Sequence, residues 1–504
     1  MILPWLILIP FIGGLACWLT GYMGSKVPRV IALASTLLLL ALSLWLWSGS
    51  SLQAVGMGAA PHWTEQFQAS WIARFGISFH LAIDGLSLVM LLLTGVVGLL
   101  AVLAAWNDVE ERSGAFYLNL MWLLAAIVGI FTAVDLFLFF VFWEAMLIPM
   151  FFLIALWGFR GTDKAAHTRT AVKFFIYTQS SGLLMLLAIL GVVFVNYYQS
   201  GELTFDYDAL LGTPLQGALG VVLMLGFFIA FAVKLPLVPF HGWMPDTHAE
   251  GPGAGSLDLA GILIKTAGFG LLRFVLPLFP EQSAAFAPIA MLLGLVSIYY
   301  GATMAFSQRD IKRLLAYSTI SHMGFVVIAI YSGSRLALQG SVVLMVASAL
   351  SGSALFIVSG LLYRRTGTRD MTQLGGLFGR VGSLSGFSLA FAMASLGIPG
   401  TANFIGEFLI LFGAFENWPI VTIIATIALV LASVYALMLL HRVYYGAPAS
   451  DTNYAGLSMR ETFMLTLSLV LLLLIGFYPQ LLLDISQQSM TEIAQWFLNP
   501  SLLQ

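Results

Sequence analysis

The sequence predicts an all-α membrane protein with about fourteen transmembrane helices. Hydrophobic residues make up 60% of its 504 residues and charged residues only 9%, whereas about 25% of the residues in a soluble globular protein are charged. Apolar runs of roughly 20 residues, the length that crosses a bilayer as a helix, recur along the whole chain. The basic residues gather in alternate connections between these runs, as the positive-inside rule predicts for a multi-pass protein.

The positions of the apolar runs give the expected spans. The first run has no basic segment before it and no usual cleavage site after it, so we expect a retained helix and not a signal peptide. Pro399 and Gly400 interrupt the twelfth run and predict a broken helix. Residues 481–504 are too polar to cross the bilayer and predict a C-terminal surface segment. The expected spans are residues 2–20, 29–48, 84–105, 116–132, 135–157, 170–196, 218–239, 256–278, 285–305, 311–331, 336–362, 383–414, 418–445 and 461–480.

Two of the runs carry a charge beside helix-breaking residues. The seventh contains Lys234 in "AVKLPLVP", and the twelfth contains Glu407 in "GIPGTANFIGEF". These runs are five spans apart, and an odd offset inverts one five-helix unit relative to the other. Inverted repeats with broken helices near the bilayer midplane are typical of secondary transporters. Within a single membrane domain, residues 1–504, we therefore expect two inverted five-helix repeats at residues 116–278 and 285–445.

The distribution of Lys and Arg predicts the orientation. Most of the 21 basic residues fall in connections on one side of the membrane, and only Arg74 and Arg335 fall on the other. Cytoplasmic loops are the ones enriched in Lys and Arg. The basic side is therefore expected to be cytoplasmic, which places both termini on the outer side.

Of the ionisable residues inside the expected spans, which also include Arg273, five form the candidate set. An ionisable residue within a span is a functional candidate by default, because a charge at the bilayer centre costs about 2.5–3.5 kcal/mol or more and needs a partner. A single ionisable residue of this kind is often only a packing contact whose hydrogen bonds are satisfied. For His322 taken alone, this interpretation is as good as a functional one. Five on five helices, with both signs of charge, favour a proton relay, because burial and partners bring such groups within reach of neutral pH. The five are Glu144, Lys234, Lys265, His322 and Glu407.

Other polar residues carry weaker signals. Asp258 lies seven residues before Lys265, so both occupy one helical face and the aspartate could pair with the lysine. The loop "HGWMPDTHAEGPGAGS" contains His241 and His248, but their spacing on a Pro/Gly-rich loop is not a recognised ligand pattern, so no metal site is predicted. Cys17 is the only cysteine. Without an iron–sulfur or nucleotide-binding motif, the chain is expected to hold no cofactor, and a net charge of −2 does not imply nucleic acid.

Six motifs together resemble one family. In chain order they are "HLAIDGLSLVMLLLT", "FVFWEAMLIPM", "FAVKLPLVPFHGWMPDTH", "GSLDLAGILIKTAGFGLLRF", "DIKRLLAYSTISHMGF" and "GIPGTANFIGEF". They are similar to the antiporter-like proton-pumping subunits of bacterial NADH:quinone oxidoreductase, respiratory complex I. Glutamate at Glu407, where the L and N types and the related antiporters usually carry lysine, resembles the M type. A subunit of a multisubunit Na⁺/H⁺ antiporter or of a membrane-bound hydrogenase is the alternative.

The resemblance implies a function for the whole chain. It implies a translocase subunit of the bacterial inner membrane, with both termini periplasmic, that moves protons from cytoplasm to periplasm and holds no redox centre. FMN, iron–sulfur clusters and quinone are then expected on partner subunits. The expected partners are the other membrane-arm and hydrophilic subunits of the complex and the lipid bilayer.

The resemblance also implies a role for individual residues. Glu144 would be the acidic partner that sets the proton affinity of Lys234. Lys265 and His322 would form the lateral path, and Glu407 would deliver protons outward, with His241 a further candidate at the inner end. Where M subunits commonly have histidine, this chain has Ser348. A serine can hold a water or pass a proton but cannot store charge near neutral pH.

Overall fold

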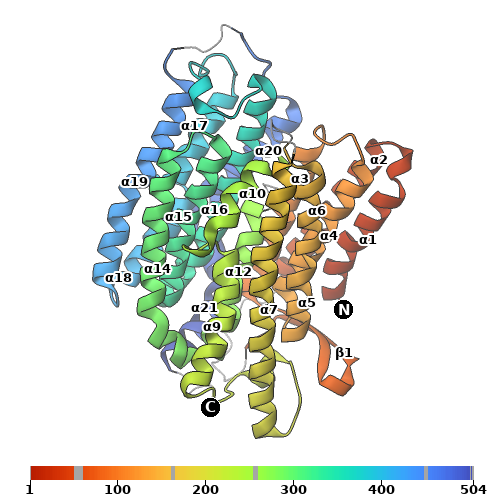
Figure 1. Ribbon diagram of the computed structural model, residues 1–504, viewed down its shortest axis with the longest axis vertical. Coiled ribbons are helices and arrows are strands. Elements are labelled where there is room, and N and C mark those ends of the chain that lie inside the picture. The colour runs from red at the N-terminus through yellow and green to blue at the C-terminus, as the bar shows by residue number, and fades with distance from the viewer. Residues whose placement is uncertain are drawn as a thin grey trace.

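Long helices lie side by side along the long axis of the molecule (Figure 1). This computed structural model describes residues 2–49, 61–159, 165–253, 259–447, 452–499 and 501. Within these ranges, 12 helices are long and apolar enough to cross a membrane. Because a bilayer offers no hydrogen-bond partner to the backbone, a helix that satisfies its own N–H and C=O groups is the expected spanning element. The prediction of a helical membrane protein is confirmed.

The elements follow one another with short connections. The described part of the first half contains α1 (Leu3–Leu19), α2 (Lys26–Gly49), β1 (Glu65–Ile72), β2 (Ile77–Ile83), α3 (Gly85–Ala105), α4 (Ser113–Thr132), α5 (Leu136–Ala145), α6 (Leu147–Trp157), α7 (Ala166–Ser200), α8 (Tyr207–Leu210), α9 (Gly217–Lys234), η3 (Phe240–Trp243) and α10 (Met244–Glu250). The second half contains η4 (Leu259–Leu263), α12 (Ile264–Gly270), η5 (Leu271–Val275), α13 (Leu276–Leu278), α14 (Pro280–Ser307), α15 (Ile311–Tyr331), α16 (Arg335–Thr366), α17 (Leu384–Ser395), α18 (Ala402–Phe415), α19 (Pro419–Tyr444), α20 (Met459–Phe477) and α21 (Gln480–Leu498).

The 12 candidate spans are fewer than the fourteen that the apolar runs predict. The first expected span corresponds to α1, which has 17 residues, and the twelfth is divided into α17 and α18. These three helices are apolar but shorter than the 12 candidate spans. The difference therefore lies in one short helix and one broken helix, and every other expected span has a helical counterpart in the described residues.

Both expected helix breaks are present. Helix α9 ends at Lys234, because Pro236 and Pro239 cannot donate to the helical ladder and their rings clash with the preceding turn. The carbonyl groups at this helix end find other donors: Ala232 accepts from the Leu237 N–H at 2.9 Å, and Val233 accepts from the Trp243 indole at 2.8 Å. Satisfied carbonyls make the break compatible with burial inside the bundle.

The second break separates α17 from α18. Gly397 and Gly400 adopt left-handed backbone angles, with φ +70° and +95°, which residues with a side chain rarely adopt. Gly400 also packs against Gly476 of α20, where a Cβ atom would collide with the Gly400 backbone. Glycine is therefore required here both for the turn and for the close approach of two chain segments.

A two-stranded antiparallel hairpin, β1–β2, departs from the all-α prediction. Its register pairs Glu65 with Ile83 and Ser70 with Ser78, and a bulge follows Ser70. The hairpin lies at the lower right of Figure 1, below the start of α1, and α7 extends further down than it does. Its strands are seven and eight residues long, too short for the pattern of bilayer-spanning runs to reveal.

Helix α21 covers part of the residues for which a surface segment is expected. It has 19 residues, and one face of it is buried against the bundle, as at Ile485 and Ile493. It lies in the lower half of Figure 1, as does the start of α1. The two ends of the described chain are therefore at the same end of the bundle.

Candidate functional site

Lys234 is held at the break that ends α9. Its side chain is fully buried. The Nζ atom lies 3.6 Å from the centroid of the Trp143 ring and donates to the Sδ atom of Met146 at 3.6 Å. Both neighbours belong to the junction of α5 and α6. A buried ammonium is thus placed against an aromatic face and a polarisable sulfur rather than against a carboxylate.

Glu144 points away from that contact. Its Oε1 atom is buried without a hydrogen-bond partner and faces Gly182 of α7, where a Cβ atom would collide with it. No ion pair within 4.0 Å joins Glu144 and Lys234 among the described residues, although the two groups interact electrostatically. The structure therefore brings the expected partners near each other without direct contact.

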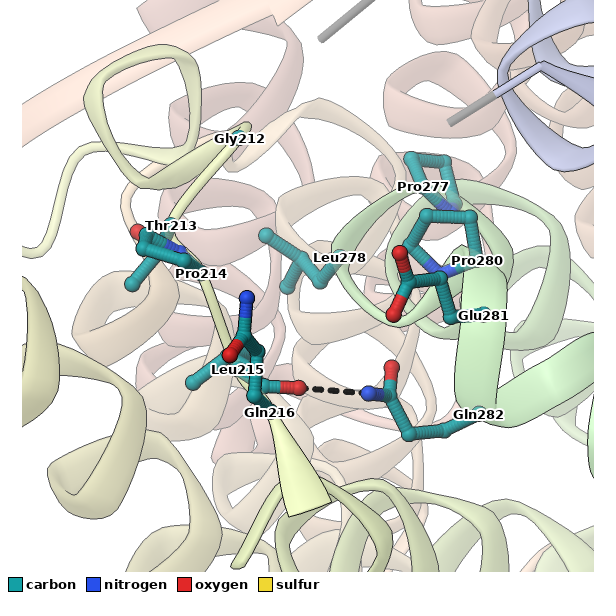
Figure 2. A pocket seen from close by; sticks show the side chains of 10 residues that line it. All are labelled: Gly212, Thr213, Pro214, Leu215, Gln216, Pro277, Leu278, Pro280, Glu281 and Gln282. Atoms are coloured by element: carbon teal, nitrogen blue, oxygen red, sulfur yellow. Dashed lines mark hydrogen bonds between the residues drawn. The ribbon is translucent and has the colours of Figure 1, made fainter. Parts of the chain in front are cut away.

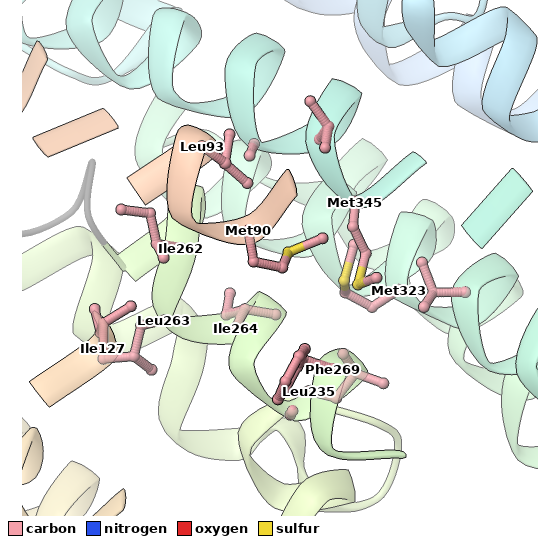
Figure 3. Close-up of a cluster of buried hydrophobic side chains, with 14 of the residues drawn as sticks. Met90, Leu93, Ile127, Leu235, Ile262, Leu263, Ile264, Phe269, Met323 and Met345 are labelled. Atoms are coloured by element: carbon pink, nitrogen blue, oxygen red, sulfur yellow. The ribbon is translucent and has the colours of Figure 1, made fainter. Parts of the chain in front are cut away.

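Lys265 lies in the centre of the bundle. It belongs to α12, and the π-helical turns η4 and η5 flank that helix. Lys265 is fully buried. Figure 3 shows the apolar side chains around this span, among them Met90, Met323 and Met345 from three other helices. A π-helical turn widens the helix locally and is frequent at functional sites.

Helix α16 lies between the Lys265 helix and α18. It runs antiparallel to both, and close contacts at glycine residues show which residues of α16 lie at the same height as residues of each neighbour. Ser348 lies between these contacts, at the height of Lys265 on one side and of Asn403 on the other. The contacts are Gly261 with Ser353 and Gly268 with Met345 on the first side, and Gly340 with Ile410 and Gly406 with Leu344 on the second.

Polar side chains gather at this level of α16 and α18. The Ser348 hydroxyl donates to the Met345 carbonyl at 3.2 Å. The Asn403 amide donates to the Ser351 hydroxyl at 3.3 Å, while the Asn403 Oδ1 atom is buried without a partner. An unsatisfied acceptor at such a place is a natural position for a bridging water.

Glu407 and His322 meet across α18 and α15. The distance from His322 Nδ1 to Glu407 Oε1 is 3.4 Å, and both side chains are buried. The Glu407 Oε2 atom faces Gly397 at the helix break, where a Cβ atom would collide with it. The Tyr435 hydroxyl is buried without a hydrogen-bond partner and interacts electrostatically with Glu407. Two of the predicted site residues are therefore in contact, and the break makes room for one of them.

The loop after the first break carries a polar network of its own. Asp246 accepts from Lys173 at 2.7 Å and from Arg313 at 2.8 Å, so its carboxylate bridges two cations. Burial opposes the charged form, but Lys173 and Arg313 hold the pKa of Asp246 below its ordinary value. The ring of His241 packs edge-on against Tyr300, and burial together with Lys173 lowers the pKa of His241. His241 is therefore favoured in its neutral form.

One predicted site residue lies outside the described residues, and the structure contains one buried ion pair that is not in the predicted set. Asp258 lies outside the described residues. The sequence places Arg273 within a span but not in the candidate set, and the structure pairs it with Asp84, the residue that caps α3. The rule that selects intramembrane charges could have included Arg273. Trp143 gives no such signal, because an apolar run containing a tryptophan is ordinary.

A small surface pocket lies apart from these groups. It is formed by the connection from Gly212 to Gln216 and by Pro277 to Gln282, where the Gln282 amide donates to the Leu215 carbonyl (Figure 2). None of the predicted site residues lines it. The candidate site is therefore the set of ionisable groups inside the bundle and not this pocket.

Comparison with known proteins gives consistent matches. The family described as NADH:quinone oxidoreductase/Mrp antiporter, transmembrane, matches residues 133–433. The chain is 57% identical over 502 residues to NADH-quinone oxidoreductase subunit M of Escherichia coli (strain K12), covering 99% of both chains. It is 58% identical over 498 residues to the subunit M of Pseudomonas aeruginosa, covering 98% of both.

A solved structure has the same architecture. A chain of respiratory complex I from Thermus thermophilus superimposes with a TM-score of 0.86 at 31% sequence identity, and the match covers 100% of both chains.

Proposed function

The chain belongs to the NADH:quinone oxidoreductase/Mrp antiporter family, as a subunit M of NADH:quinone oxidoreductase, and we propose that its buried Glu, Lys and His residues carry protons from cytoplasm to periplasm. One observation carries the proposal: Lys234, Lys265, His322 and Glu407, which lie on four different helices, are all buried inside the bundle. The proposed row runs from Glu144 and Lys234 through Lys265 to His322 and Glu407. Such groups cost free energy in a bilayer, so they are rare there and commonly mark transport pathways.

The proposed topology has fourteen spans, with α1 and the broken α17–α18 pair added to the 12 candidate helices. Residues 116–278 and 285–445 form the two inverted repeats, each with one broken helix, inside a single domain of residues 1–504. Both termini are periplasmic, and residues 481–504 lie at that surface. The placement of α21 and of the start of α1 at one end of the bundle supports the two termini being on the same side of the membrane.

The proposed driving force comes from other subunits. This chain is expected to carry no cofactor, whereas FMN, iron–sulfur clusters and quinone are expected on its partners. Moving one proton against 100 mV costs about 2.3 kcal/mol. Making an ion pair at 4 Å, with an effective dielectric constant near 20, yields about 4 kcal/mol. Making or breaking one such pair, driven by the partner subunits, therefore involves more free energy than moving one proton against 100 mV requires.

The proposed path passes from the broken α9 to the broken α18. Lys234 exchanges a proton under the control of Glu144, and His241 and Asp258 serve the inner side. Lys265 passes it laterally at the level of Ser348, and the His322–Glu407 contact receives it. The 3.4 Å separation of these last two groups is short enough for a slight movement to complete a hydrogen bond. Protons then leave from Glu407 to the outer side.

The direct test is NADH-driven proton uptake by sealed vesicles that contain the purified complex. Replacing Lys265 by leucine puts an apolar side chain of moderate size in its place and removes the central titratable group. We expect the rate of NADH-driven proton uptake to fall by about tenfold or more, which corresponds to a barrier raised by about 1.4 kcal/mol or more. Native uptake by an assembled Lys265→Leu complex would contradict the proposal. Mass spectrometry of the copurifying chains identifies the partners.

Ser348 gives a test specific to this chain. If a water held near the hydroxyl carries the lateral step, Ser348→Ala slows proton uptake by roughly twofold to tenfold, the range for one lost hydrogen bond. Ser348→His should be tolerated, because it supplies the group that is common in the family. Ser359→Ala is the matched control, a buried serine on the same helix three turns away. Poor assembly of Ser348→His would mean that packing has closed around the serine, and the path then lies elsewhere.

A further inference from the structure

The Lys234 ammonium rests on an aromatic ring. Its Nζ atom is 3.6 Å from the centroid of the Trp143 indole and 3.6 Å from the Sδ atom of Met146. The face of an aromatic ring attracts cations, most strongly for tryptophan and where water is absent. Lys234, Trp143 and Met146 are all fully buried, so these contacts act without competition from solvent.

Helix geometry separates this position from the carboxylate. Trp143 and Met146 are three residues apart and share one face of their segment. Glu144 follows Trp143 directly and is turned by about 100° around the helix axis, toward Gly182 of α7. The two charges nevertheless interact electrostatically. The flexible four-carbon stem of lysine lets the ammonium pass from ring to carboxylate while both helices stay in place.

We propose that Trp143 is a positioning residue that holds the Lys234 ammonium in competition with Glu144. While the ammonium rests on the indole face and on the Met146 sulfur, Lys234 and Glu144 form no ion pair. The ion pair forms when the ammonium moves from Trp143 to the Glu144 carboxylate. The ammonium keeps its protons during this movement, so the step is a change of position only. The inference rests on the proposed function, because it assigns a resting position to a lysine of the relay.

Fluorinated tryptophans at position 143, introduced by suppression of a stop codon, test the inference most sharply. Each fluorine withdraws electron density from the ring and weakens its attraction for a cation, while the size of the ring is nearly kept. We expect proton uptake per NADH oxidised to fall stepwise along the series, by about fivefold in total. The complex should assemble at the native level throughout. Uptake that stays at the native level along the whole series would overturn the inference.

Ordinary substitutions give an independent ordering. Trp143→Phe keeps a weaker ring and Trp143→Leu removes it, so proton uptake should decrease from wild type to Phe to Leu. Phe139→Leu is the matched control, because Phe139 is a buried aromatic residue one turn earlier on α5 that packs on Trp143 at 5.7 Å between ring centroids. It should leave the uptake ratio unchanged. If Trp143→Leu does not assemble, the fluorinated series decides.

The outcome for Lys234 itself separates two failures. If Lys234→Ala pumps normally, the relay fails and the role of Trp143 fails with it. If Lys234→Ala does not pump but the fluorinated complexes pump at the native level, the relay stands and only the positioning role is wrong.

Discussion

Replacing Lys234 by alanine is expected to abolish NADH-driven proton uptake and to depress coupled quinone reduction strongly, in a complex that still assembles. The substitution removes the cation that interacts electrostatically with Glu144 at the broken end of α9. A carboxylate buried without a cation is costly and takes up a proton. The Glu144 carboxylate then stays protonated and no longer alternates between its charged and neutral forms. Glu144→Ala should have the same effect, because the lysine then has no acidic group that can draw it from Trp143. Dye-quench measurements on sealed vesicles, normalised to assembled complex, provide the readout.

A charge-matched control keeps this test specific. Lys26 is exposed at the start of α2, and Lys26→Ala should pump as the wild type does. Alanine at either position removes one positive charge, so a difference between the two variants cannot come from net charge. Normal proton uptake by an assembled Lys234→Ala complex would exclude this lysine from the relay.

Glu407→Gln is expected to lose most of the proton uptake. Glutamine has nearly the shape of glutamate and can still bond to His322, but it does not titrate. The 3.4 Å contact between His322 and Glu407 then loses the charge that alternates. Uptake is measured at matched expression in the same vesicles. Near-native uptake by this variant would make Glu407 a packing residue.

Two further substitutions of Glu407 show whether proton uptake depends on a titratable group or on the size of the side chain. Glu407→Asp keeps the carboxylate and shortens its reach by one methylene, so it should retain more proton uptake than Glu407→Gln. Glu407→Lys restores a titratable group of opposite sign and should be partly active. Glu416→Gln is the matched control, since Glu416 is an exposed glutamate at the end of the same helix. Its uptake should equal that of the wild type.

Much of the fold follows from hydropathy and from helix-breaking residues. The bilayer fixes the length of a span, so runs of about 20 apolar residues locate helices without knowledge of their neighbours. Proline at 236 and 239 and glycine at 397 and 400 determine where two helices break, because they act on the local backbone. The same breaks place Lys234 at the end of α9 and Glu407 in the second turn of α18, both inside the bundle.

The contacts of the site depend on packing and could not be predicted in the same way. The expected Glu144–Lys234 pair has no direct contact, because Trp143 and Met146 occupy the position next to the ammonium. Whether a lysine turns to a ring or to a carboxylate is decided by rotamers and neighbouring helices, which a linear pattern does not contain. The contact of His322 with Glu407 likewise depends on how α15 packs on α18. The hairpin was missed because its short alternating strands lack the signal of a span.

The two glycines that face the carboxylates determine which parts of the relay move. Gly182 and Gly397 let an oxygen of Glu144 and of Glu407 rest directly against main chain. Main chain in a packed bundle shifts only by collective motions, on the scale of microseconds to milliseconds. A lysine stem needs only rotations about its own bonds. In the proposed relay, the carboxylates of Glu144 and Glu407 are therefore expected to stay in place while the Lys234 side chain moves, and this movement does not have to wait for a rearrangement of the helices.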